Sequence, residues 1–362
     1  MLGQIRMKNA AEISVQFPLF LLGFTLLGGV AVDLIPDFIW HDQQRIGQIF
    51  LLVIATVVII SRANSPLLIS LNSLSRQSRL ALGLGFMLGG ASVLLSTYLR
   101  FAGLEWATLI LLVGLALALA AEARLSQHQF DRWALRLMLV LATVISLKIT
   151  TGYVAATVEG LKLDTIALFE GTFSNRRVFG QVASMVIPIL AYPLLAKKLP
   201  PTQHGGVFAL LAVWWMLVIV SGTRGTWMAL SVAAVILAAV SWHAASAWLK
   251  VQILALAWGA LLFGILFVGV PTGLGMDASL ENRLVNLATL SGREVIWSIA
   301  WEQIQAHPWL GIGPMHLAAI RNDAGAHPHN AVLQMAAEWG IPAALAFLVP
   351  VGLGIAHLLA KI

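Results

Sequence analysis

Apolar runs of about twenty residues dominate the chain, and short polar segments separate them. A helix needs about 20 apolar residues to cross the ~30 Å hydrocarbon core of a bilayer. The runs are continuous and do not alternate as the strands of a membrane barrel do, so they indicate helices. We therefore predict an all-α, polytopic membrane protein with about ten transmembrane helices, near residues 13–36, 44–62, 79–99, 103–122, 132–155, 178–198, 205–221, 224–243, 249–270 and 340–360.

The composition agrees with this class. The chain is 59% hydrophobic and 10% charged, whereas a soluble domain carries about 25% charged residues. The absence of cysteine excludes disulfides and thiolate chemistry. The net charge of +6 fits basic loops beside membrane lipids together with a few anion-binding arginines, and we expect no nucleic-acid partner.

The distribution of charge predicts the orientation. With the N-terminus in the cytoplasm and alternating spans, only three acids fall on the cytoplasmic side, which satisfies the positive-inside rule. We expect transmembrane helices 1–9 in residues 1–270, a large periplasmic loop with amphipathic helices in 271–338, and a last transmembrane helix in 339–362. The cytoplasmic loops then hold Arg62, Arg76, Arg79, Arg124, Arg132, Arg136, Lys197, Lys198 and Lys250.

Six arginines depart from this rule because they fall on the outer side. Charge at the membrane edge is costly, by about 2.5–3.5 kcal/mol on insertion scales. One interpretation is that these side chains reach toward lipid headgroups. The other is an anion clamp, because a guanidinium matches phosphate oxygens bidentately. The six are Arg176, Arg177, Arg224, Arg283, Arg293 and Arg321.

Arg293 has the most specific local pattern. Ser291 and Glu294 form a capping box, which predicts an amphipathic helix over about 292–306. Arg293 then lies in the first turn, where backbone N–H groups and the helix dipole favour an anion. The alternative is an ion pair with Glu294 or Glu281.

A histidine and an asparagine lie together at His329 and Asn330. Pro328 ends the preceding segment, and a helix is predicted from about His329 to Glu338. Three interpretations of His329 stay open: a capping or exposed residue, a metal ligand together with His327, or a general base. An unperturbed imidazole pKa near 6.5 is suitable for a general base. The metal interpretation lacks a third ligand in the sequence. Asn330 would orient the imidazole ring or bind a sugar.

Other common machinery is missing from the sequence. The outer face has no Asp-x-Asp motif, and the chain has no Walker loop and no Ser-His-Asp set. We therefore expect neither a metal nor a cofactor, and a substrate that carries its own leaving group.

Four motifs together resemble the O-antigen ligase and polymerase superfamily. They are SGTRGTW at 221–227, GREVIW at 292–297, HPWLGIG at 307–313, and the pair His329–Asn330. The similarity covers roughly residues 174–345. That family has about twelve helices and one large periplasmic loop before its last spans.

The resemblance implies an inverting, metal-independent glycosyl transfer at the periplasmic side of the bacterial inner membrane, from an undecaprenyl diphosphate-linked glycan. By position, Arg224 and Arg293 would bind the diphosphate and His329 would activate the acceptor hydroxyl. The segment FSNRRVFGQ resembles a third motif, in which Arg177 is favoured over Arg176.

The predicted function is O-antigen ligase, with lipid A–core as the acceptor. The modest loop and the absence of a large soluble C-terminal region favour it. The alternatives are an O-antigen polymerase, a protein O-oligosaccharyltransferase and a lipid-linked oligosaccharide transporter. A transporter would carry mid-membrane charges and broken helices in corresponding halves.

Overall fold

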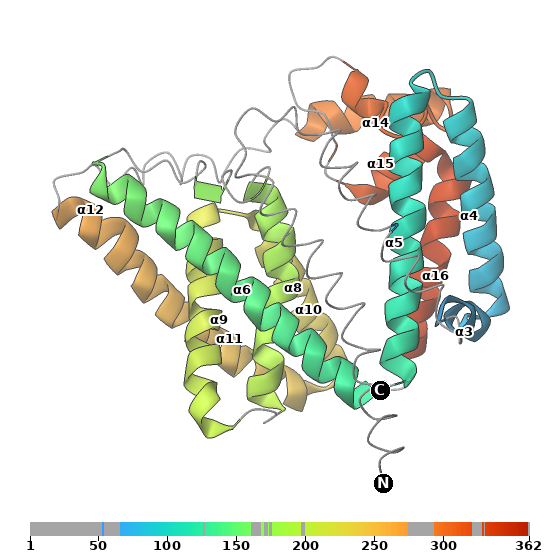
Figure 1. Ribbon diagram of the computed structural model, residues 1–362. Coiled ribbons are helices and arrows are strands. Elements are labelled where there is room, and N and C mark those ends of the chain that lie inside the picture. The colour runs from blue at the N-terminus through green and yellow to red at the C-terminus, as the bar shows by residue number, and fades with distance from the viewer. Residues whose placement is uncertain are drawn as a thin grey trace, which may run out of the picture. The chain divides into compact units, whose positions relative to one another are not determined.

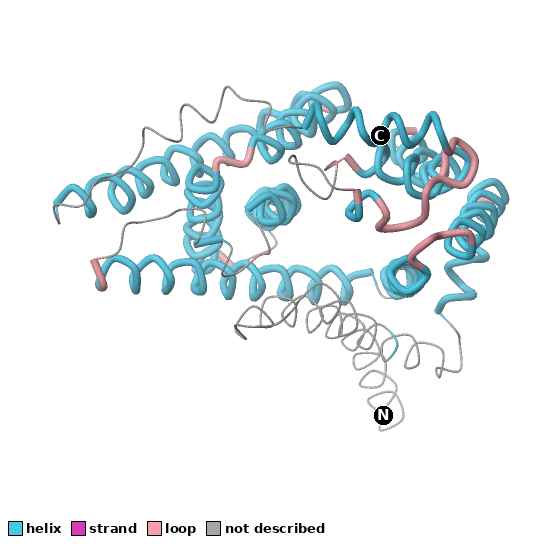
Figure 2. The backbone as a smooth tube through the Cα atoms, turned by 90° about the horizontal axis from the view of Figure 1, so that it is seen from above, coloured by secondary structure: helices cyan, strands magenta, loops and turns pink. Residues whose placement is uncertain are grey.

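The computed structural model describes most of the chain after residue 65. The described residues are 53, 66–125, 127–160, 168–169, 173, 176–196, 200–273, 293–320, 328 and 330–360. Within these ranges the regular elements are helices and no strand occurs (Figure 1), and Figure 2 shows the helices joined by short loops. The all-α prediction is confirmed for this part of the chain.

The chain forms two compact units. The helices of unit 1 are α3 (Pro66–Ser73), α4 (Arg76–Leu94), α5 (Leu99–Leu125), α14 (Arg293–Ala306), η2 (Leu317–Ala319), α15 (Ala331–Trp339) and α16 (Ile341–Leu359). Those of unit 2 are α6 (Gln127–Val158), α8 (Arg176–Leu195), α9 (Pro201–Ser221), α10 (Arg224–Val240), α11 (Trp242–Phe263), η1 (Gly264–Gly269) and α12 (Val270–Gly273).

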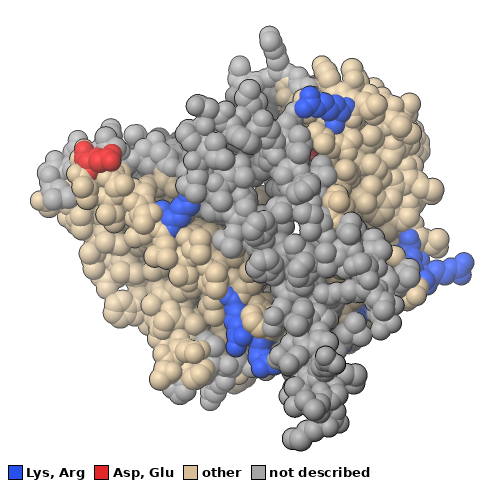
Figure 3. Space-filling view, viewed as in Figure 1, with Lys and Arg blue, Asp and Glu red and all other residues tan. Residues whose placement is uncertain are grey.

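Several of these helices can cross a membrane, so this is a multi-pass membrane protein. Among the described residues, five helical spans are long and apolar enough: Leu99–Ala121, Phe130–Val158, Val178–Leu195, Thr202–Ser221 and Trp242–Gly269. Two shorter apolar helices are Arg224–Val240 and Ile341–His357. The runs at 13–36 and, apart from Val53, 44–62 lie outside the described residues, so the count of ten stays a prediction. Figure 3 shows few charged side chains on the described part of the face in view.

Unit 2 is organised around α9. Its side chains Leu211, Trp214 and Leu217 are fully buried, because α8 and α11 both pack against this helix. The indole Nε1 of Trp214 donates to the carbonyl of Ala142 on α6, at 3.3 Å. The polar N–H of the indole thus has a hydrogen-bond acceptor inside an apolar core, and this hydrogen bond joins α9 to α6.

Helices α9 and α11 approach each other at backbone distance. A Cβ atom at Gly259 of α11 would lie 2.7 Å from the carbonyl oxygen of Ala212 and 2.8 Å from the nitrogen of Met216. Small residues allow this kind of approach between membrane helices.

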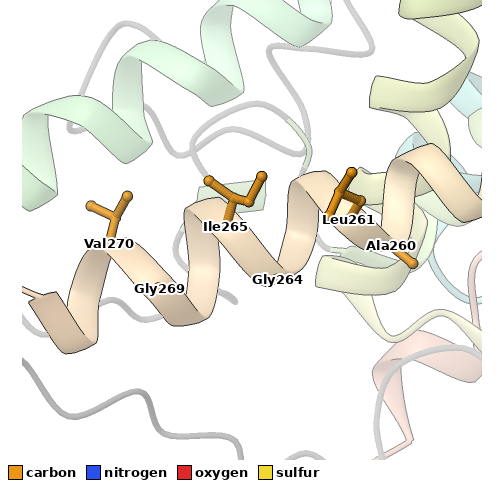
Figure 4. Close-up of a pocket in the computed structure, with 6 residues that line it drawn as sticks. All are labelled: Ala260, Leu261, Gly264, Ile265, Gly269 and Val270. Carbon is orange, nitrogen blue, oxygen red and sulfur yellow. The ribbon is translucent and has the colours of Figure 1, made fainter.

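The end of α11 widens into the π-helical segment η1. The hydroxyl of Tyr153 on α6 donates to the carbonyl of Leu266, so a side chain from α6 supplies a partner for this irregular backbone. Figure 4 shows Leu261, Ile265 and Val270 projecting from one side of this helix, along a groove of about 500 Å³. The lining is apolar and offers no group for acid–base chemistry.

Unit 1 is built on α4 and α16, which pack side by side. A Cβ atom at Gly89 of α4 would lie 2.7 Å from ring atoms of both Trp106 and Trp339. The rings of Trp106 and Trp339 are themselves 5.3 Å apart. This aromatic packing holds the end of α15 against α4 and α5.

The contact at Gly259 generates a test of the packing in unit 2. Gly259→Ala forces a methyl group into the backbone of α9 and should cost about 1–3 kcal/mol of stability. Gly264→Ala is the control, because nothing lies within 4 Å of a Cβ there. Melting temperatures of both variants in detergent check this, and equal values would refute the close approach.

Candidate functional site

The candidate residues divide between the two units. Unit 2 contains Arg176, Arg177 and Arg224, while unit 1 contains Arg293 and Asn330. His329 lies outside the described residues, between Pro328 and Asn330, which are described. Each group is therefore built up within its own unit.

Three helices begin at a candidate arginine. Helix α8 starts at Arg176, α10 at Arg224 and α14 at Arg293. The first turn of a helix has backbone N–H groups without intrahelical partners and a partial positive charge, so an arginine there adds to a site that already favours anions. The capping box predicted the position of Arg293, and the predicted spans 224–243 and 178–198 begin at and near the other two arginines.

In unit 2, the starts of α8 and α10 lie side by side (Figure 1). Thr226, in the first turn of α10, donates its hydroxyl hydrogen bond to the carbonyl of Gly180 in the first turns of α8, at 2.8 Å. A Cβ atom at Gly180 would lie 2.8 Å from the Cβ of Thr223. The structure thus brings the helix starts at Arg176 and Arg224 together.

A chain of buried hydroxyls fixes the turn before Arg224. Ser221 and Thr226 each donate to a backbone carbonyl, and the hydroxyl of Thr223 lies 3.0 Å from Ser221 and 3.1 Å from Thr226. Thr223 has one proton for these two neighbours, so one of the two contacts is made at a time. Gly222, at φ 62°, ends α9 in the left-handed conformation. These residues explain why SGTRGTW alternates small and hydroxyl residues around Arg224, which is half-buried.

In unit 1, the start of α14 lies beside the segment that precedes α15. The indole Nε1 of Trp297, one helical turn after Arg293, donates to the carbonyl of Pro328 at 2.7 Å. Pro328 is buried and directly precedes His329 in the chain. The indole therefore connects the helix start at Arg293 to the segment that carries the candidate base. Sequence reasoning missed this role of Trp297, although the residue stands in the GREVIW motif.

Asn330 is the N-cap of α15, which corrects the predicted helix start near His329. Its Oδ1 accepts from the backbone nitrogen of Leu333 at 3.1 Å, and the helix proper begins at Ala331. Asparagine is among the best N-cap residues because its short side chain reaches this donor. Because Oδ1 is used in the cap, a hydrogen bond from Asn330 to a substrate would be donated by its Nδ2.

The HPWLGIG segment crosses the end of α15 at backbone distance. Ile312 and Gly313 donate to the carbonyls of Ala337 and Glu338 at 3.0 and 2.9 Å. A Cβ atom at Gly311, where φ is 65°, would lie 2.4 Å from the carbonyl of Glu338. The glycines of the motif are thus explained by close packing and a left-handed turn.

His316 has a structural role. Its Nε2 accepts from the backbone nitrogen of Tyr98 at 3.0 Å, and its Nδ1 lies 3.0 Å from the carbonyl of Pro314, to which it donates. Both ring nitrogens of the buried imidazole are thereby used. His316 joins the loop after α14 to the start of α5.

Glu338 is a buried carboxyl that the sequence did not single out. It is 2% exposed, and it accepts from the nitrogen of Leu317 and from Nε2 of Gln334, each at 3.3 Å. Burial is the main cause that raises its pKa from 4.5 to about 7, while hydrogen bonds, including one from the backbone of Met315, act in the opposite direction. Helix α15 lies outside the candidate spans. The carboxyl holds the turn at 315–317 against α15.

The helix starts at Arg176, Arg224 and Arg293 are positions that favour an anion. Guanidinium groups and backbone N–H groups both match phosphate oxygens. Within the described ranges, no three His, Asp or Glu side chains lie close enough together to hold a metal ion. The described residues thus offer three helix starts that favour an anion, together with the half-buried Arg224, while the candidate base His329 lies outside the described residues.

Comparison with known families gave one match. Residues 207–348, from α9 to α16, match the family model described as O-antigen ligase. The matched segment contains Arg224, Arg293, His329 and Asn330, while Arg176 and Arg177 precede it. Neither the curated proteins nor the solved structures gave a match.

The raised pKa of Glu338 predicts a pH-dependent stability. The folded protein binds the proton of Glu338 more tightly than the unfolded chain does. The contribution of this proton to the free energy of unfolding is therefore fully present below pH 4.5 and is lost as the pH rises through about 7. The loss amounts to about 3 kcal/mol. We expect the melting temperature of the wild type to fall relative to Glu338→Gln between these pH values. Glutamine keeps the shape and does not titrate, so parallel curves would contradict the assignment.

Proposed function

The chain belongs to the O-antigen ligase superfamily through residues 207–348, and from this premise we propose that it transfers O-antigen polysaccharide from undecaprenyl diphosphate to lipid A–core. The observation that carries the proposal is the pair of arginine-led helix starts joined at Thr226 and Gly180. A diphosphate leaving group needs such a site, because its negative charge grows as the glycosidic bond breaks.

In the proposed reaction, Arg224 and Arg293 bind the diphosphate, and Arg177 or Arg176 lies at the mouth of the site. His329 takes the proton of the acceptor hydroxyl while the hydroxyl oxygen forms a bond to the anomeric carbon. The bond from that carbon to the diphosphate oxygen breaks, and the electron pair leaves with the phosphate. Attack from the opposite side inverts the configuration, and neither metal nor cofactor is required.

The site is proposed to face the periplasm of the bacterial inner membrane. The support is the charge distribution: the basic loops fall on one side, and the arginines at 176, 177, 224 and 293 fall on the other. The donor would then reach the enzyme within the bilayer, since its polyprenyl chain is apolar.

A purified transfer assay tests the proposal. The reconstituted protein receives an undecaprenyl diphosphate-linked glycan together with lipid A–core, a second donor molecule or an acceptor protein. Consumption of lipid A–core supports the ligase. Consumption of the second donor indicates the polymerase, consumption of the protein indicates the protein O-oligosaccharyltransferase, and movement of the donor without transfer indicates a transporter. Loss of activity in EDTA would overturn the metal-independent step.

Substitutions at the site should separate binding from chemistry. We expect Arg224→Ala and Arg293→Ala to lower turnover by about 100-fold or more, because each removes preorganised charge from the leaving group. Lysine should restore little, since it cannot bind bidentately. His329→Ala should lower turnover by about 100-fold or more while the donor still binds. Arg79→Ala, an exposed arginine on α4, is the control, and wild-type transfer in the site variants would refute the assignment.

Trp297 provides a sharper test of geometry. Trp297→Phe keeps an aromatic ring but removes the N–H that donates to the carbonyl of Pro328. We expect kcat to fall about tenfold, the equivalent of one hydrogen bond of about 1.4 kcal/mol, with the melting temperature nearly unchanged. Trp301→Phe, one turn further along α14 and exposed, is the matched control. Equal kcat values in the two variants would show that the indole does not position the base.

A further inference from the structure

Helix α14 has one buried side and an exposed aromatic flank beside it. Ala300 and Ile304 are buried in a cluster that includes Ala337 of α15. Trp297 and Trp301 are four residues apart, so they lie on one flank of the helix, and the side chain of Trp301 is 55% exposed. On a helix that faces only water, this flank would carry polar residues. The two indoles therefore indicate an amphipathic surrounding.

The side of α14 opposite its buried face is polar. Glu294, Ser298 and Glu302 are exposed and follow one another at four-residue spacing. Val295 is exposed singly beyond this stripe, which is common on protein surfaces. A polar stripe with large aromatic side chains beside it is typical of a helix that lies in the membrane–water interface.

Two other exposed aromatic residues lie where helices of unit 1 enter the membrane. Tyr98 directly precedes the candidate span at the start of α5. Trp309, which is 74% exposed, lies at the start of the apolar helix α16, because the backbone nitrogen of Ile341 donates to the carbonyl of Pro308 at 2.9 Å. Tryptophan and tyrosine are enriched at the headgroup level of membranes. These two residues therefore indicate the level of one bilayer surface in unit 1.

Helix α14 lies at this level. It packs against α15, and the end of α15 contacts the last turns of α4, where the hydroxyl of Ser92 donates to the carbonyl of Glu338 at 3.0 Å. In the loop that follows α14, Nε2 of His316 accepts from the backbone nitrogen of Tyr98 at 3.0 Å. Figure 1 shows α14 at the end of unit 1 where α4 ends and α5 begins. A helix held by these contacts cannot lie far above the bilayer.

We propose that α14 lies in the interface of the bilayer, with Trp297 and Trp301 among the lipid headgroups at the level of Tyr98 and Trp309. The partner of the aromatic flank is the lipid surface itself, which continues the membrane contact of α5 and α16. This position holds the helix start at Arg293 at the depth of lipid phosphate groups. The inference does not depend on the proposed glycosyl transfer, because it concerns the depth of the helix alone.

Fluorescent labels on single cysteines test this depth, since the chain has no cysteine of its own. The full chain is placed in nanodiscs of phosphatidylglycerol and phosphatidylethanolamine, and a label is attached in Trp301→Cys or Trp309→Cys. Ser298→Cys and Glu302→Cys are the matched controls on the polar stripe of the same helix, and Leu112→Cys in the middle of α5 reports the hydrocarbon. Quenching is measured with a nitroxide lipid labelled near the headgroup, with one labelled deep in the acyl chain, and with aqueous iodide.

We expect the shallow nitroxide to quench the labels at 301 and 309 most strongly, iodide to quench those at 298 and 302, and the deep nitroxide to quench the one at 112. Iodide quenching at 301 equal to that at 298 would show that α14 lies in water and would overturn the proposal. Protection of the label at 301 from iodide and from both nitroxides would indicate a protein contact and would overturn it as well.

The test separates depth from folding and from catalysis. Each labelled variant keeps the other aromatic residues of the flank, so if one variant fails to fold, the other still measures the depth. The nanodiscs contain no substrate, and the quenching result is therefore independent of the outcome of the transfer assay.

Discussion

Backbone polar groups that leave a helix near lipid need partners inside the protein, because hydrocarbon supplies none. In this protein side chains provide such partners at several places where a helix ends or widens. The hydroxyl of Tyr153 donates a hydrogen bond to the π-helical turn at Leu266. The hydroxyl of Thr226 donates to the carbonyl of Gly180, and the indole of Trp297 donates to the carbonyl of Pro328. Glu338 serves the turn at 315–317 from within a buried site. Much of the irregular backbone in the described residues is therefore specified by particular polar side chains, and the family motifs contain several of them.

This requirement links structure to the proposed chemistry. A charged group at a membrane edge is useful only if its backbone is held, since an arginine on a loose segment loses its orientation and gains little from a leaving group. The hydroxyl chain at Ser221, Thr223 and Thr226 holds the start of α10, and the indole of Trp297 holds the start of α14. Tyrosine, tryptophan and hydroxyl residues thus supply the rigidity that the arginines need, within each unit separately.

The sequence predicted the helices well and their long-range partners poorly. Hydropathy located the described spans, and the helix predicted over about 292–306 ends at Ala306 as expected. Periodicity carries no information on contacts between distant segments, so the bonds from Trp297 to Pro328 and from Leu317 to Glu338 were not foreseen. The start of α15 was predicted near residue 329 because Pro328 ends the preceding segment, and Asn330 was expected to orient the imidazole ring or to bind a sugar rather than to cap the helix. The roles of Arg176, Arg177, Arg224, Arg293, Asn330 and His329 remain predictions.

Helix α9 connects the core of unit 2 to the turn that carries Arg224. Its 21 residues correspond to about 30 Å, the thickness of the hydrocarbon core, so its two ends meet opposite surfaces of the bilayer. The helix begins at Pro201 and ends at Ser221, directly before the turn to Arg224. The helix itself is held by the buried Trp214 and by the backbone contact at Gly259. The packing around α9 therefore holds in place the helix whose end leads into the turn at Arg224, so the rigidity of this proposed binding position comes from the core of unit 2.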